Sequence, residues 1–109
     1  MVNPFRGEVE LSVDGSPRVM RLTLGALAEL EARLKCDSLL DMIARFETGA
    51  FRVRDLISLL TAGLNGGGWA ITETDLVRRQ IDGGPLAAAQ AAAQLLKITF
   101  TLPGEGEEA

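Results

Sequence analysis

The sequence predicts an α+β domain in which an N-terminal β-hairpin precedes a mainly helical bundle of about five helices. Three observations support this fold class. Residues 7–13 alternate strictly between the two faces of a strand, leucines take up helical spacing from residue 24 onward, and only 5% of the 109 residues are aromatic. This aromatic content is low for an all-β sandwich, whereas residues that favour helices are abundant.

The hairpin is expected over residues 7–22. Apolar side chains at every second position of residues 9–13 are typical of a half-buried strand. Asp14-Gly15 supplies a turn, because both residue types tolerate the positive φ that a short hairpin loop needs. Ser16-Pro17 suggests a longer loop, after which residues 18–22 form the return strand.

Two helices are expected next, over residues 24–35 and 38–48. Leucines three and four positions apart mark the first of them. Ser38 and Asp41 resemble a capping box at the start of the second helix. Gly49 is the expected residue just past its end.

The third helix, residues 54–64, is expected at the centre of the bundle, because its apolar stripe is too broad for a surface helix. The Asn-Gly-Gly-Gly run at residues 65–68 ends it, and Thr72 caps a short fourth helix over residues 73–80. The stripes predict a core that includes Leu27, Leu30, Ile43, Phe46, Leu56, Leu60 and Leu64.

A fifth helix is expected over residues 86–97, which are rich in Ala and Gln and follow a proline. Residues 98–102 alternate apolar and β-branched polar side chains, so they either continue the helix or form a strand that pairs with the hairpin edge. Residues 103–109 are expected to be a disordered acidic tail, which leaves a single domain over residues 1–102.

The fifth helix and the segment after it are the predicted partner-binding site. Small side chains let another backbone approach closely, and an uncovered apolar edge suits docking by helix packing or strand addition. The alternative is that this helix closes the core. The predicted partner-binding residues are Leu86, Ala89, Ala93, Leu96, Ile98, Phe100 and Leu102.

Charge and residue content exclude several functions. The net charge of −4 gives no bulk attraction to nucleic acid or to an anionic membrane. The chain has no His and one Cys, Cys36, so we expect no catalytic residues, no metal, no cofactor and no enzyme activity. Charged residues throughout the first 30 positions and the lack of a long apolar run predict a soluble, cytoplasmic protein.

Two motifs invite a nucleic-acid or phosphate interpretation. The three glycines at 66–68 resemble a phosphate cradle, but no lysine follows them, so a helix stop and turn is favoured. A helix-turn-helix over residues 54–80 is disfavoured, because the turn is long and the second helix begins with acidic residues.

Three arginines, Arg45, Arg52 and Arg54, bracket the loop between the second and third helices. They are able to hold a carboxylate or a phosphate. The favoured interpretation is that they are solvated helix ends with Asp41 and Asp55 as partners.

Four strings carry a resemblance to a known family: NPFRGEV at 3–9, LTLGALAELE at 22–31, RFETGAFR at 45–52 and AGLNGGG at 62–68. They resemble the small tail protein of gene transfer agents, the phage-like particles of alphaproteobacteria that package host DNA. The resemblance implies a gene between those of the tail tube and the tape measure, where long-tailed phages encode a tail assembly chaperone. The family is also labelled a tail tube protein.

The resemblance and the helical prediction together favour a noncatalytic tail assembly chaperone, because tail tube subunits are β-rich rings. Its implied partners are the tape-measure protein and other tail proteins, with a possible homo-oligomer. A structural tail tube component is the first alternative, and a small DNA-binding regulatory module is the second.

Overall fold

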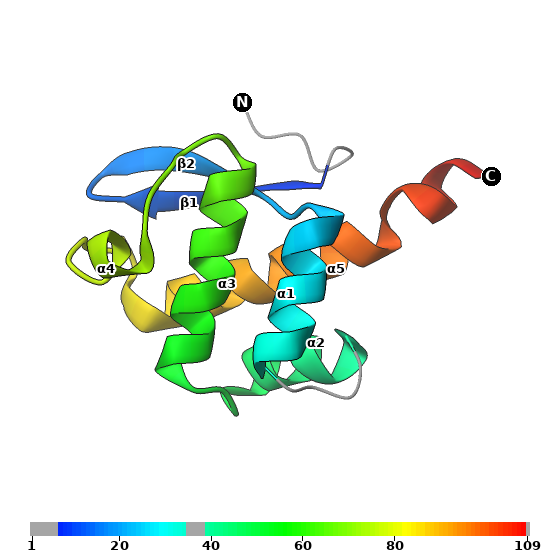
Figure 1. Cartoon of the computed structure of the whole chain (residues 1–109), viewed down its shortest axis with the longest axis horizontal. Coiled ribbons are helices and arrows are strands. Elements are labelled where there is room, and N and C mark those ends of the chain that lie inside the picture. Colours follow the sequence, from blue (N-terminus) through cyan, green and yellow to red (C-terminus); the bar gives the residue numbers. More distant parts are fainter. Residues whose placement is uncertain (1–6, 35–38, 109) are drawn as a thin grey trace.

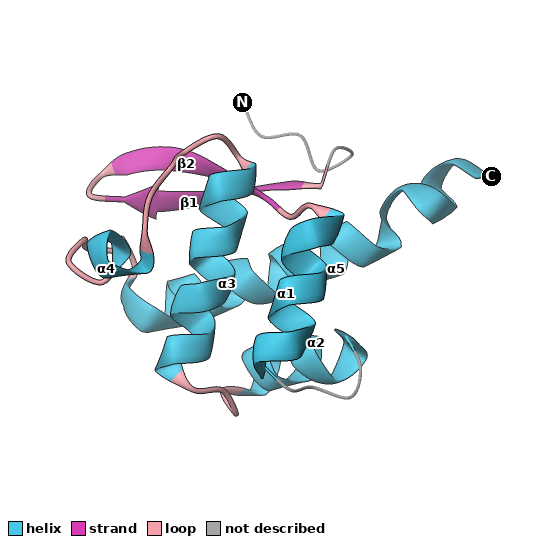
Figure 2. Ribbon diagram, viewed as in Figure 1, coloured by secondary structure: helices cyan, strands magenta, loops and turns pink. Residues whose placement is uncertain are grey.

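The computed structural model describes residues 7–34 and 39–108, and it confirms the α+β class. A two-stranded antiparallel hairpin lies along one side of a group of five helices (Figure 1). Figure 2 shows how small the sheet is beside the helices. The elements in chain order are β1 (Glu8–Val13), β2 (Ser16–Arg21), α1 (Leu24–Leu34), α2 (Leu39–Thr48), α3 (Val53–Gly66), α4 (Glu73–Leu76) and α5 (Gly84–Glu108).

The hairpin turn is tighter than the sequence suggests. Val13 pairs with Ser16, so the loop holds only Asp14 and Gly15, at φ values of 53° and 79°. Positive φ at both loop residues fits the twist of a two-residue hairpin. The longer loop expected from Ser16-Pro17 is therefore wrong, because both residues already belong to β2.

The end of β1 pairs along its free edge with residues 80–82. The Asp14 N–H donates to the Gln80 carbonyl oxygen at 2.8 Å, and the Asp82 N–H donates to that of Ser12 at 3.0 Å. Val13 and Ile81 form an isolated antiparallel bridge. The sequence offered residues 98–102 as a strand for this edge, but they are helical in α5.

The core lies between the hairpin, α3 and α5. Four leucines of α3 and several alanines and leucines of α5 are almost fully buried. The predicted central place of the third helix is confirmed, with Leu60 only 2% exposed. Six of the seven predicted core residues are buried, and Leu27 is half-buried against them.

The end of α3 approaches β2 more closely than a side chain would allow. A Cβ atom on Gly66 would lie 1.9 Å from the Arg21 carbonyl oxygen, and one on Gly67 would lie 2.0 Å from that of Val19. Both glycines are thus needed for contact between helix and strand. The same contact carries α3 to Gly66, past its predicted end at residue 64.

Two helices differ from their predicted lengths. The fourth helix ends at Leu76 instead of residue 80, because residues 80–82 leave it to join β1. The last helix begins at Gly84 and runs to Glu108, beyond its expected end at residue 97, and it includes residues 103–108, for which a disordered tail was expected. Its end leads away from the rest of the domain (Figure 1).

Several predictions fall on residues that the structure leaves out. Lys35, Cys36 and Ser38 lie outside the described residues, as does Ala109, so the end of the first helix at residue 35 and the capping box at Ser38 stay predictions. Gly49 follows α2 at a φ of 84°, as expected of a residue just past a helix end.

Candidate functional site

The predicted partner-binding strip on α5 is largely inside the domain. Ala89, Ala93 and Leu96 are 4%, 5% and 0% exposed, so they contact this chain's own core. This correction follows from packing: small side chains let α5 press against α2 and the hairpin. Leu86 is exposed and Ile98 is half-buried, while the side chains of Phe100 and Leu102 lie outside the described residues. Partner binding stays a prediction for this strip.

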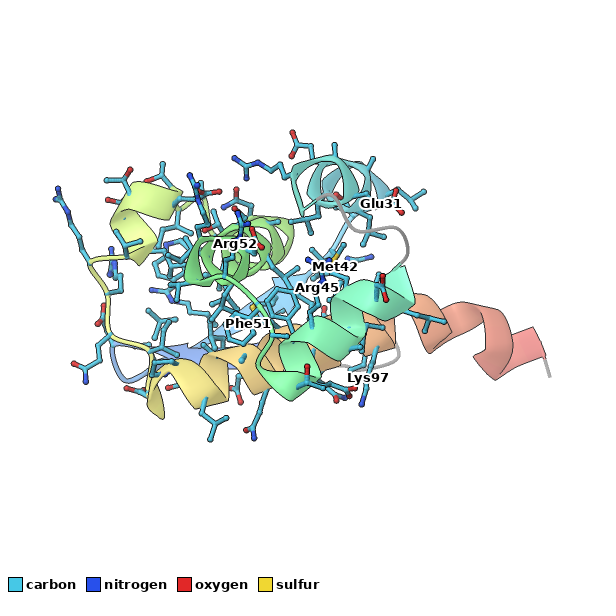
Figure 3. All side chains as sticks on the ribbon, turned by 90° about the horizontal axis from the view of Figure 1, so that it is seen from below. Glu31, Met42, Arg45, Phe51, Arg52 and Lys97 are labelled. Atoms are coloured by element: carbon cyan, nitrogen blue, oxygen red, sulfur yellow. The ribbon has the colours of Figure 1, made fainter. Side chains whose placement is uncertain are left out.

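A groove between α2 and the start of α5 borders part of the strip. Its volume is about 560 Å³, and Leu86, Ala89 and Ala93 line it together with Phe46 and Phe51. The two phenylalanine rings lie 5.1 Å apart, centre to centre. Figure 3 shows Phe51 and Lys97 beside α2. An ion pair between Lys97 and Glu47 bridges α5 and α2 at the groove.

A second apolar groove runs between α3, α4 and the start of α5. Its volume is about 550 Å³, with the buried Leu60 and Leu76 among its lining residues. Val53 and Val77 also line it and are 66% and 56% exposed, although both are apolar. No sequence pattern indicates this groove, because it depends on how the short α4 lies against α3.

A third hollow, of about 520 Å³, is lined by arginines from three helices. It holds the three arginines that the sequence singled out, Arg45, Arg52 and Arg54, and adds Arg33 from α1. Figure 3 shows Arg45 on α2 and Arg52 at the start of α3. Asp55, Ser58 and Glu73 complete the lining. We call this hollow the arginine cavity.

Arg33, Ser58 and Glu73 form a polar triad in the lining of the arginine cavity. Arg33 donates from Nη1 to Glu73 Oε2 at 2.8 Å, and Ser58 Oγ donates to the same oxygen at 3.1 Å. The hydrogen bond from Arg33 to Glu73, together with the charge attraction of Glu73, raises the pKa of the Arg33 guanidinium above its ordinary value. Arg33 therefore stays charged and tied to α4.

A further polar cluster fixes the hairpin to the loop before α5. Arg79 donates to Asp14 Oδ2 at 3.2 Å, and the Gln80 N–H donates to Asp14 Oδ1 at 3.0 Å. The Gln80 hydrogen bond is the largest of the influences that lower the pKa of the Asp14 carboxyl. The guanidinium carbons of Arg18 and Arg79 lie 3.9 and 5.3 Å from the centre of the Trp69 ring.

The glycine turn after α3 has the features of a helix end. Carbonyl oxygens of β2 face Gly66 and Gly67, and the Asn65 side chain donates to the Trp69 and Ile71 carbonyls at 2.9 Å each. These contacts support the helix-stop interpretation over a phosphate cradle. The four residues of α4 are also too short for the recognition helix of a helix-turn-helix.

Neither a metal cluster nor a membrane-spanning helix is found in the described part of the chain. No group of three or more His, Cys, Asp or Glu side chains there is placed to hold a metal ion. None of the helices there has the length and apolar content to cross a bilayer.

The fold and these hollows define a small, mostly helical α+β domain with two apolar grooves and one basic cavity on its surface. A family model described as phage tail tube protein, GTA-gp10, matches residues 6–101. The match covers the hairpin, the first four helices and most of α5, so the chain belongs to this family of phage tail proteins. Comparisons with curated proteins and with solved structures give no match.

Proposed function

We propose that this chain is a noncatalytic structural component of the tail of a gene transfer agent, in which it contributes to the tail tube. The observation that carries the proposal is the family match over residues 6–101. It takes in every element that builds the core and the residues that line the three hollows described above. The partners are other tail proteins and further copies of this chain.

The apolar grooves support a role based on protein contacts. Val53, Val77 and Leu86 are large apolar side chains that stay exposed around the start of α5. Exposed apolar surface beside a groove favours association with another protein, because its burial is favourable. A tail subunit needs such surfaces toward its neighbours.

A second candidate is an assembly chaperone for the tape-measure protein. One observation favours it: the only sheet in the described residues has two strands, whereas the rest of the chain there is mainly helical. Tube subunits of long-tailed phages are β-rich rings, so a helical domain is less suited to forming a tube wall. Helix-in-groove contact with a helical tape measure would use the apolar grooves.

Counting copies in purified particles separates the two candidates. We expect quantitative mass spectrometry, normalised to the major capsid protein, to find many copies of a tube component in every particle. A chaperone would be abundant in the producing cell, absent from the particle and co-purified with the tape measure. Absence from particles together with no tape-measure complex would overturn both.

A further inference from the structure

The arginine cavity concentrates positive charge on an acidic chain. Four arginines and two carboxylates line it, so its local net charge is +2, whereas the whole chain carries −4. Its arginines come from α1, α2 and the start of α3, which the fold brings together. Like charges gathered around one hollow repel one another, and an anion between them removes that repulsion.

Most of these arginines lack an ion-pair partner within the part of the chain that the structure describes. Arg33 forms an ion pair in the cavity, with Glu73. Within residues 7–34 and 39–108, Arg45, Arg52 and Arg54 form no ion pair with a carboxylate. Asp55, which the sequence suggested as a partner, lines the cavity but forms no ion pair with these arginines. Among the described residues, these three guanidinium groups therefore have no carboxylate partner.

The available groups suit carboxylates. A guanidinium presents a planar fork of donors that matches the two oxygens of a carboxylate or phosphate. A volume of about 520 Å³ is enough for two or three acidic side chains of a peptide. The Arg33–Glu73 pair forms part of the lining, so the arginines of α2 and α3 are the ones that we expect a ligand to contact.

We propose that the arginine cavity binds the carboxylates of an acidic protein segment. This rests on the proposed function in one respect, that the chain makes contacts with tail proteins. A short acidic segment experiences mainly the local positive charge, because screening limits interactions to about 10 Å at a salt concentration of about 0.1 M. A nucleic acid would extend over the acidic remainder of the surface and be repelled.

This chain itself contains a segment of that chemistry. Glu105, Glu107 and Glu108 follow one another with a single glycine between the first two, and no basic residue follows Lys97. The end of α5 leads away from the domain (Figure 1). An acidic segment of the required kind is thus supplied either by a second copy of this chain or by another tail protein.

The test uses the full chain and a fluorescent peptide with the sequence of residues 102–109, read by fluorescence anisotropy. We expect binding that weakens with added salt, and no binding of the same peptide with its three glutamates changed to glutamine. Arg45→Gln and Arg52→Gln should each weaken binding by about fivefold, since each removes one charged contact. Arg78→Gln removes an exposed arginine outside the cavity and should change affinity by less than about twofold.

Absent peptide binding, or equal binding by the Arg45→Gln, Arg52→Gln and wild-type chains, would overturn the proposal. Tighter binding of a single-stranded oligonucleotide at the same arginines would also overturn it, in favour of nucleic acid. Analytical ultracentrifugation then identifies the source. Self-association lost on changing Glu105, Glu107 and Glu108 to glutamine assigns a second copy, and a chain that binds the peptide but stays monomeric assigns another tail protein. Because the isolated chain is measured, failure here leaves the tail assignment untouched.

Discussion

Replacing Gly66 by alanine tests the contact between α3 and β2, on which the fold depends. The new methyl carbon would lie 1.9 Å from the Arg21 carbonyl oxygen, whereas real contacts stay beyond 3.0 Å, so β2 or α3 must move by about 1 Å. Overpacking of this kind costs roughly 3 kcal/mol, and the better helix propensity of alanine returns up to about 1 kcal/mol. We expect a net loss of about 2 kcal/mol in the free energy of unfolding.

Gly25 provides the matched control, because it is also helical and an added methyl group there has its nearest neighbour at 4.0 Å. Gly25→Ala should raise the free energy of unfolding by up to about 1 kcal/mol. Urea denaturation followed by circular dichroism measures both variants. If Gly66→Ala proves as stable as Gly25→Ala, then β2 does not press against α3 and the packing argument fails.

Three further predictions concern the surface, the last helix and the hairpin. Val77→Lys should impair tail assembly without lowering the melting temperature, whereas Leu24→Lys, at a still more exposed apolar site outside the grooves, should change neither; equal effects of both would contradict a role for the groove. Truncation after residue 94 should unfold the domain, seen as loss of helical circular dichroism, because it removes two fully buried leucines; a folded product would show that α5 is peripheral. Asp14→Asn should lower stability at neutral pH. The pKa of the Asp14 carboxyl is lowered in the folded chain, so the stability that Asp14 contributes is present above a pH of about 3.8 and is lost as the pH falls through the folded pKa. The free energies of unfolding of the wild-type and variant chains should therefore converge in acid. A difference that persists in acid would contradict this prediction.

Local signals in the sequence carried much of the fold. Alternation around Asp14-Gly15 predicted the hairpin, and the broad apolar stripe predicted the central α3. The Thr72 side chain accepts a hydrogen bond from the Asp75 N–H at 3.1 Å, as the capping pattern predicted. Each of these features depends on residues within a few positions of one another.

The remaining features depend on contacts between distant segments. No local pattern in residues 80–82 indicates that they pair with β1. The glycines at 66 and 67 indicate only a turn from the sequence, and their close contact with β2 depends on the folded structure. The alanines of α5 were ambiguous between a core and a docking surface, because small residues suit both. The sequence indicated part of the arginine cavity, because Arg45, Arg52 and Arg54 are near one another in the chain. Arg33 joins them only through the packing of α1 against α3.

Deletion of the gene in the cell that encodes this chain, followed by electron microscopy of the particles, tests the central claim most directly. As a component of the tail or of its assembly, the chain should be required for complete tails. We expect heads without normal tails, and restoration of tails when the wild-type gene is returned. Particles with complete tails in the deletion strain would contradict the account.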